Sequence, residues 1–112
     1  MNTINYKDIE VMKNPHGVEA KKLLDTQHSQ VVHMNLKPGE SLRRHRTPVD
    51  VFFYILEGEG FVEIGDEKVL VKKDTLIESP KGIPHCLHNE SNNDFRVLVV
   101  KTPSPIKQTE II

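Results

Sequence analysis

Short apolar runs constrain the fold of this chain more than any other feature of its sequence. The runs are rich in Val, Ile and Phe, and clusters of Pro, Gly, Asn and Asp separate them. β-Branched and aromatic residues favour strands, whereas the separating residues favour turns. Stretches with a helical period are almost absent. The pattern therefore predicts an all-β protein of many short strands, arranged as a sandwich or barrel.

We expect a strand in each apolar run. The segment 60–71 is expected to form a β-hairpin, because Gly65-Asp66 supplies a turn between two alternating runs. Residues 18–24 contain good helix formers, so a short helix stays an alternative to the strand that we favour there. The predicted strands are 9–12, 19–24, 30–37, 51–57, 60–64, 67–71, 75–79, 85–89 and 95–101.

The length of 112 residues suits a single domain, 1–112, with a barrel core at about 30–101. Pro103 and Pro105 remove ladder donors, so residues 102–112 are expected to be a C-terminal tail that lies over a neighbour. The single cysteine, Cys86, cannot form an intrachain disulfide and is expected to be a small buried apolar residue. This cysteine usage suits the cytoplasm.

Charge and motif content exclude several function classes. Fifteen Lys and Arg residues balance sixteen Asp and Glu residues without forming blocks, which argues against a nucleic-acid partner. The longest apolar runs are far shorter than a membrane span, and the amino terminus lacks a signal pattern, so no membrane partner is expected. A nucleotide fingerprint and a nucleophile paired with a base are both missing, which argues against hydrolase, kinase and dinucleotide chemistry and against a nucleotide cofactor.

Two motifs stand in order along the chain. The first, PGESLRRHRTPVDVFFYILEGEG, runs from Pro38 to Gly60, and the second, DTLIESPKGIPHCLHN, runs from Asp74 to Asn89. Each resembles a motif of the cupin superfamily, and the chain is similar to its small, single-domain, RmlC-like members. The resemblance covers about two-thirds of the chain. It implies an antiparallel double-stranded β-helix, the jelly-roll or cupin barrel, with the two motifs on facing strands around a pocket.

The resemblance also implies a divalent metal in that pocket, held by two histidines and a glutamate of the first motif and one histidine of the second. His45 and His85 stand at two of these positions. Thr47 stands where the second histidine is expected and Val51 where the glutamate is expected. A site of two imidazoles binds Zn, Fe, Ni, Cu or Mn weakly, because a threonine hydroxyl is a poor ligand and valine is none.

The predicted ligand pocket centres on His45 and His85. Residues two apart on a strand share a face, which adds further side chains to this pocket. A pair of core histidines that bond to each other or to Asn89 without metal is the alternative. The predicted pocket residues are His45, Thr47, Phe53, His85, Leu87 and Asn89, with His45 and His85 as the metal ligands.

His33 and Asp50 are possible additional metal ligands, whereas the other histidines are expected elsewhere. Asp50 lies one residue from the glutamate position, which turns it to the opposite face unless a bulge restores its direction. His33 can face either side of its strand, so it is a possible third pocket imidazole. His16, His28 and His88 are expected on the surface, the first two in loops and the last by its parity opposite to His85.

Three functions follow from these residues. A small-molecule-binding barrel with a degenerate metal site fits the substitutions best. A divalent-metal-dependent enzyme of the oxygenase, isomerase or decarboxylase type is the second. The third is a structural or interaction module, and it is compatible with both others. A homodimer is expected in each case, because Phe52 and Tyr54 have outward parity on a strand too apolar for open water.

Overall fold

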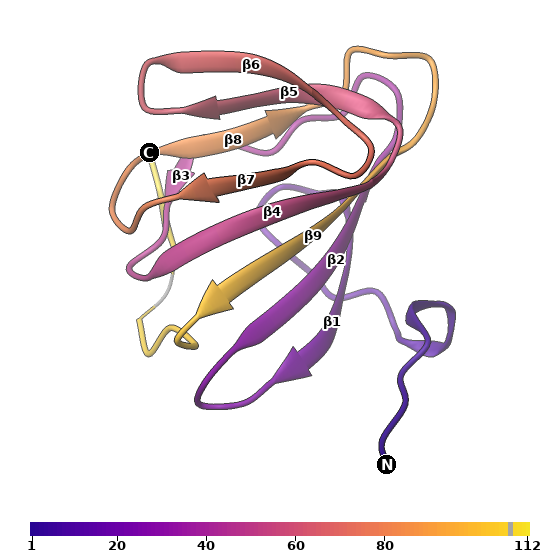
Figure 1. Ribbon diagram of the computed structural model, residues 1–112, viewed down its shortest axis with the longest axis vertical. Helices are drawn as coiled ribbons and strands as arrows, with labels where there is room; N and C mark the ends of the chain where they lie inside the picture. The colour runs from indigo at the N-terminus through magenta and orange to yellow at the C-terminus, as the bar shows by residue number, and fades with distance from the viewer. Residues whose placement is uncertain (108) are drawn as a thin grey trace.

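The computed structural model describes residues 1–107 and 109–112, and its strands form two five-stranded sheets (Figure 1). Sheet A has the order β1-β2-β9-β4-β7, and sheet B has the order β10-β3-β8-β5-β6. Neighbouring strands in both sheets pair antiparallel. The strands are β1 (Glu19–Asp25), β2 (Gln30–Leu36), β3 (His45–Arg46), β4 (Asp50–Glu57), β5 (Glu59–Ile64), β6 (Glu67–Lys72), β7 (Leu76–Ser79), β8 (His85–His88), β9 (Phe95–Thr102) and β10 (Glu110–Ile111).

The hydrophobic core lies between the two sheets, because alternate side chains of each strand point inward. On β4 the side chains of Val51, Phe53 and Ile55 are buried, whereas the intervening Phe52 and Tyr54 are half-buried on the other face. The strand β9 shows the same alternation, whereas on β2 the outward His33 is buried as well. The inward side chains of β2, β5, β8 and β9 that complete the core include Val32, Met34, Leu36, Val62, Leu87, Phe95, Val97 and Val99. The all-β double-stranded barrel predicted from the sequence is confirmed.

Glycines permit two local features of the barrel. Gly65 has φ of 58° in the two-residue connection between β5 and β6, which confirms the predicted hairpin. Gly60 packs so closely against the ring of Phe95 that a Cβ atom there would lie 2.5 Å from a ring carbon. A side chain at residue 60 would therefore displace a core aromatic residue.

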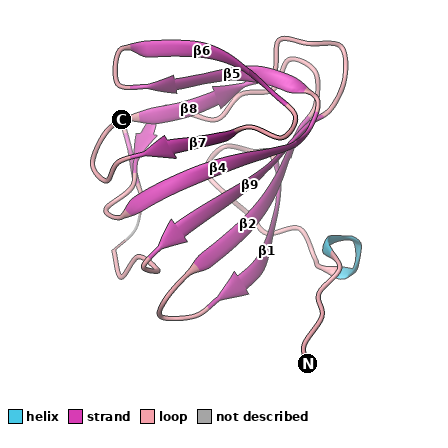
Figure 2. Ribbon diagram, viewed as in Figure 1, coloured by secondary structure: helices cyan, strands magenta, loops and turns pink. Residues whose placement is uncertain are grey.

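The amino-terminal segment differs from the prediction. Residues 9–12 form no strand, although the backbone N–H of Met12 donates a hydrogen bond to the carbonyl of Ala20 at 2.8 Å. A short 3₁₀ helix, η1 (Tyr6–Asp8), precedes them and is cyan in Figure 2. Within the described ranges, no helix has the length and apolarity needed to cross a lipid bilayer.

Residues 19–25 form the strand β1 rather than the alternative helix. The strand pairs with β2 from Glu19 opposite Asn35 to Asp25 opposite Gln30, with a bulge between Lys22 and Leu24. Ala20 is fully buried on its inner face. Cross-strand pairing therefore overrides the local helix propensity of the segment.

The carboxyl-terminal segment is more than the predicted tail. Residues 110–111 form β10, which pairs with β3 so that Ile111 lies opposite His45 and Glu110 opposite Arg46. Together with β1, this strand extends the barrel beyond both ends of the predicted core at 30–101. The two prolines break the ladder after β9, as expected, but the chain then returns to its own sheet B.

Candidate functional site

Two histidines from different motifs meet inside the barrel. His45 begins β3 and His85 begins β8, and the two residues lie opposite each other in the ladder of sheet B. Their Nε2 atoms are 3.0 Å apart, and their rings meet edge to face with centroids 4.4 Å apart. Both side chains are buried. The structure thus brings the two predicted histidines into direct contact.

The hydrogen bonds around this pair fix its tautomers when both rings are neutral. His45 Nδ1 lies 2.6 Å from the carbonyl oxygen of Arg43, which can only accept, so this nitrogen carries the hydrogen. His45 Nε2 is then the acceptor, and His85 Nε2 donates to it. His85 Nδ1 in turn accepts from the hydroxyl of Ser79 at 2.6 Å. One directed chain therefore runs from Ser79 through both imidazoles to the Arg43 carbonyl.

Burial keeps both rings neutral. It lowers the pKa of His85 to about 3, and repulsion from His45, when that ring is protonated, and from Lys101 acts in the same direction. Burial also lowers the pKa of His45; the bond to the Arg43 carbonyl opposes this shift, and Lys101 adds to it. At neutral pH the pair is therefore two uncharged imidazoles in low-dielectric surroundings.

The other predicted pocket residues divide into apolar and polar neighbours. The ring of Phe53 stands edge-on to that of His85, with centroids 5.2 Å apart. Leu87 follows His85 on the inner face of β8 and is fully buried. Thr47 is buried with its Oγ1 atom 3.5 Å from His85 Nε2, at the limit of a hydrogen bond.

The structure corrects the role of Asn89. The residue is buried, but its side-chain amide donates to the carbonyls of Leu36 and Asn93 at 2.8 and 2.7 Å. Its Oδ1 atom accepts from the backbone N–H and the hydroxyl of Ser91. Both amide hydrogens are used, so Asn89 ties a loop to β2 and has no donor left for a ligand or a histidine.

Neither His33 nor Asp50 completes the interior site. His33 lies on the face of β2 opposite to the core residues, where its ring stacks on Tyr6 at 4.3 Å and its Nε2 accepts from Arg96 at 3.1 Å. Tyr6 of the amino-terminal segment covers the His33 ring. The pattern of β2 alone does not predict this burial. The exposed Asp50 accepts from the backbone N–H of Lys81 at 2.9 Å. Asp50 therefore holds the loop at Lys81, and no bulge at this end of β4 turns its side chain inward.

His16 is the member of the site that sequence reasoning missed. It was expected on the surface, yet it is half-buried and its ring centroid lies 4.7 Å from that of His45. Its Nδ1 atom accepts from the backbone N–H of Arg43 at 2.9 Å. Burial lowers its pKa to about 4, with His45 and Arg43 contributing. The result is a row of three imidazoles, of which His16 is the outermost.

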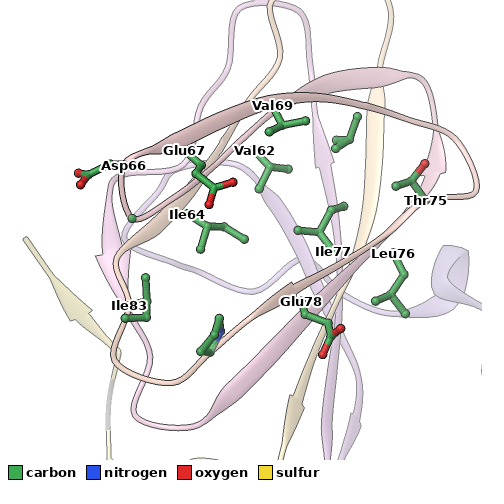
Figure 3. A pocket seen from close by; sticks show the side chains of 13 residues that line it. Val62, Ile64, Asp66, Glu67, Val69, Thr75, Leu76, Ile77, Glu78 and Ile83 are labelled. Atoms are coloured by element: carbon green, nitrogen blue, oxygen red, sulfur yellow. The ribbon is translucent and has the colours of Figure 1, made fainter.

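A cavity of about 770 Å³ lies between the sheet edges formed by β6 and β7 (Figure 3). Its walls are mainly apolar and include Ile64 and Ile77. Ile64 lies opposite His85 in the ladder, and Ile77 lies opposite Phe53, whose ring contacts His85. None of the six predicted pocket residues lines the cavity, although two of its wall residues are ladder neighbours of His85 and Phe53. Its polar wall groups come from Asp66, Glu67, Thr75 and Glu78.

The interior residues do not fit the four-ligand metal site that the cupin resemblance implies. Metal–nitrogen distances of about 2.0–2.1 Å would let two Nε2 atoms 3.0 Å apart share one ion. The remaining two positions are filled by Thr47 and Val51, which supply neither an imidazole nor a carboxylate. Three other side chains with suitable atoms, Glu63, Cys86 and His88, lie together on the outer face of sheet B.

Comparisons with known proteins agree with the fold and the motifs. The chain is 32% identical over 72 residues to the tetracenomycin polyketide synthase protein TcmJ of Streptomyces glaucescens, covering 63% of this chain and 48% of that protein. The chain thus spans about half the length of TcmJ. A Thermus thermophilus protein, TT1209, has 28% identity and a TM-score of 0.80, covering 94% of this chain and all of that one.

The polyketide cyclase RemF of Streptomyces resistomycificus has the same fold, with 20% identity and a TM-score of 0.85 over 100% of this chain and 85% of that one. The Cupin domain family matches residues 32–101, from β2 to β9. This match includes both motifs, both histidines of the pair and most strands of the two sheets. The chain therefore belongs to the cupin family.

Proposed function

We propose that this cupin binds a small, largely apolar organic molecule in the cavity between β6 and β7. The observation that carries the proposal is the size and the lining of the cavity. Its volume of about 770 Å³ lies within the range of roughly 300–1,000 Å³ that is usual for ligand sites. Mainly apolar walls with a few convergent polar groups are also typical of such sites.

The charges around the cavity indicate which kind of ligand suits it, and the neighbouring histidine pair adds no charge. Both rings are neutral and bonded to each other, so the pair offers no net charge to attract an anion. The cavity adds carboxylates but no lysine or arginine side chain. A neutral ligand with hydroxyl groups matches these walls better than a carboxylate or phosphate does, because hydroxyls can donate to Glu67 or Glu78.

The names of two similar proteins suggest which class of compounds to test first. TcmJ is a polyketide synthase protein and RemF is a polyketide cyclase, and both resemble this chain over most or all of its barrel. Aromatic polyketides are flat, apolar and hydroxylated, which agrees with the walls of the cavity. We therefore propose hydroxylated polycyclic aromatic compounds as the ligand class.

Titration of a hydroxyanthraquinone, followed by protein NMR, tests this proposal. Saturable shifts are expected for residues around Ile64 and Ile77. Ile77→Trp should fill the cavity and abolish binding, whereas Leu70→Trp, on the exposed face of β6, should leave it unchanged. Absence of saturable binding, or equal binding by both variants, would contradict the proposal.

A metal-dependent reaction is the second candidate, and the convergent Nε2 atoms of His45 and His85 are the observation that favours it. Metal analysis of untagged protein provides the test. A stoichiometric metal that disappears in both His45→Gln and His85→Gln would favour this candidate. Retention of the metal in these variants would place it elsewhere.

We also propose that the protein is a homodimer that uses the outer face of sheet A. Phe52 and Tyr54 lie on this face, and the neighbouring Leu76 is 51% exposed. Covering these side chains would remove apolar surface from water. Sedimentation at micromolar concentration should show a dimer for the parent and a monomer for Phe52→Arg. A monomeric parent would refute the proposal.

A further inference from the structure

Three side chains with metal-ligating atoms converge on the outer face of sheet B. Glu63 comes from β5, and Cys86 and His88 come from the neighbouring β8 (Figure 1). The Sγ atom of Cys86 lies 3.0 Å from Glu63 Oε2 and 3.4 Å from His88 Nε2. His88 Nε2 also contacts Glu63 Oε2 directly. Each atom of this outer cluster therefore touches both others.

The strand register explains why these residues meet. Cys86 and His88 are two apart on β8, so their side chains share a face. Glu63 lies directly opposite Cys86 in the antiparallel ladder between β5 and β8. Cross-strand neighbours lie about 5 Å apart at Cβ, close enough for side chains of this length to touch. The cluster is thus part of the regular sheet and does not depend on a loop.

A fourth residue orients His88. Its Nδ1 atom lies 3.0 Å from the hydroxyl of Ser41, which pairs with His88 through an isolated β-bridge. A bond at one ring nitrogen commonly sets the direction of the other nitrogen when histidine binds a metal. In this protein the bond from Ser41 to Nδ1 directs Nε2 of His88 toward Cys86 and Glu63. The side chains of His88 and Glu63 are 24% and 30% exposed, so an ion can enter from solvent.

The surroundings of Cys86 argue against a role as a nucleophile. Burial raises the pKa of its thiol to about 12, and the bond to Glu63 acts in the same direction. A reactive cysteine needs a lowered pKa, because the thiolate is the attacking species. The arrangement of sulfur, nitrogen and carboxylate instead matches the ligand types of a zinc site.

We propose that Glu63, Cys86 and His88 form a binding site for a thiophilic divalent cation of the Zn²⁺ type, with water at the fourth position. In tetrahedral zinc sites the ligand atoms lie about 3.3–3.6 Å apart, given the usual metal–ligand distances. The Sγ–Nε2 separation of 3.4 Å already has this value. The Glu63 carboxylate contacts both other atoms more closely and has to turn outward on its flexible side chain to admit the ion.

Charge balance also suits a divalent ion. On binding, the Cys86 thiol loses its proton to solvent and the sulfur–metal bond forms. His88 binds through Nε2 as a neutral imidazole, so its ring hydrogen moves from Nε2 to Nδ1, which then donates to the Ser41 hydroxyl. The thiolate and the Glu63 carboxylate then neutralise the two positive charges of the ion. Lys68 lies opposite Glu63 in the ladder, but its Nζ atom is 3.9 Å from Glu90 and stacks over the Phe61 ring.

Cobalt binding to the reduced protein provides the test, because Co²⁺ replaces Zn²⁺ and gives a sulfur-to-cobalt charge-transfer band in the near ultraviolet. Cys86 is the only cysteine in the chain, so the interior histidine pair cannot produce this band. We expect the band to saturate at one equivalent of Co²⁺ and to disappear when Zn²⁺ is added. A reduced, folded wild type without the band would overturn the proposal.

Matched variants assign the remaining ligands. His88→Gln and Glu63→Gln should each raise the dissociation constant for Zn²⁺ by at least about 10- to 100-fold, and Ser41→Ala by about 10-fold. His28→Gln removes an exposed histidine and should have no effect. Unchanged affinity in both His88→Gln and Glu63→Gln would overturn the proposal. Circular dichroism of each variant confirms that the comparison is made on folded protein.

Discussion

The two faces of β8 have opposite chemistry. On the inner face, His85 is neutral, buried and fully bonded to His45 and Ser79. On the outer face, the buried Cys86 and the partly exposed His88 contact the carboxylate of Glu63, which is itself 30% exposed. The alternation of a single short strand thus separates an uncharged imidazole pair from a charged group of potential ligands.

The difference shows how burial selects the partner of an imidazole. An ionised carboxylate inside the barrel would have to be paired or protonated, because its desolvation is costly. Val51 and Thr47 impose no such cost beside His45 and His85. Outside the barrel, solvent reduces the penalty, so Glu63 can stay ionised next to His88. Four predictions test this comparison.

The largest expected difference is between two alanine substitutions on this strand. His85→Ala should lower the free energy of unfolding by about 3–5 kcal/mol, because it leaves a cavity and two unpaired buried groups. His88→Ala should cost less than about 1 kcal/mol, since its bonds are partly exposed. Urea unfolding measures both. Equal losses would show that the inner pair is no more tightly integrated than the outer cluster.

The second prediction restores the missing interior ligands. Thr47→His with Val51→Glu, made in a Cys86→Ser background to disable the outer cluster, should create a metal site around His45 and His85. At a metal concentration 100 times the dissociation constant, stabilisation should be about 2–3 kcal/mol. Thermal melts with chelator and with excess Zn²⁺ measure it against the Cys86→Ser parent. Equal shifts in the two proteins would mean that the parent barrel already holds a complete site.

The third prediction concerns pH. The pKa of His85 is lowered to about 3 in the folded protein, whereas the unfolded chain binds its proton near pH 6.5. Stability is therefore full above about pH 6.5 and is lost as the pH falls toward 3, at up to about 1.4 kcal/mol per pH unit. His85→Gln should flatten this dependence in urea titrations at pH 7, 6 and 5. An unchanged slope would assign the acid sensitivity to other groups.

The smallest effect is expected for Thr47→Val. The Thr47 hydroxyl lies at the limit of hydrogen-bonding distance from His85, so its loss should cost less than about 1 kcal/mol. Binding of the hydroxyanthraquinone should also change little, because Thr47 does not line the cavity. A loss of affinity without a loss of stability would extend the ligand site to the histidine pair.

Local patterns predicted most of the strands, and the resemblance to the cupin motifs predicted the barrel and the meeting of His45 with His85. Alternating apolar residues determine which side chains face inward, and the cupin resemblance implies that the two motifs lie on facing strands. Register is harder to predict because it depends on how distant strands pair. The contact of Glu63 with Cys86 has a partial signal, since Cys86 and His88 share a parity, but the pairing of β5 with β8 had to be known.

Other parts of the site had no local signal. The contact between His16 and Arg43 joins a loop to the strand region 27 residues away. The burial of His33 depends on the position of Tyr6 outside sheet A, where no periodicity operates. Asn89 has the parity of a pocket residue, yet nearby carbonyls satisfy its amide first, as is common for asparagine in loops.

Because the carboxyl-terminal segment pairs with sheet B, the two ends of the chain differ in how well they tolerate an attached tag. The backbone of Ile111 lies opposite His45, and the N–H of Ile112 bonds to the carbonyl of Arg44 at 3.1 Å. A fusion partner or affinity tag joined at the carboxyl end would disturb the pairing of β10 with β3, the strand that holds His45. The other end lies beyond sheet A, away from β3 (Figure 1), and is the safer point of attachment for immobilisation or labelling.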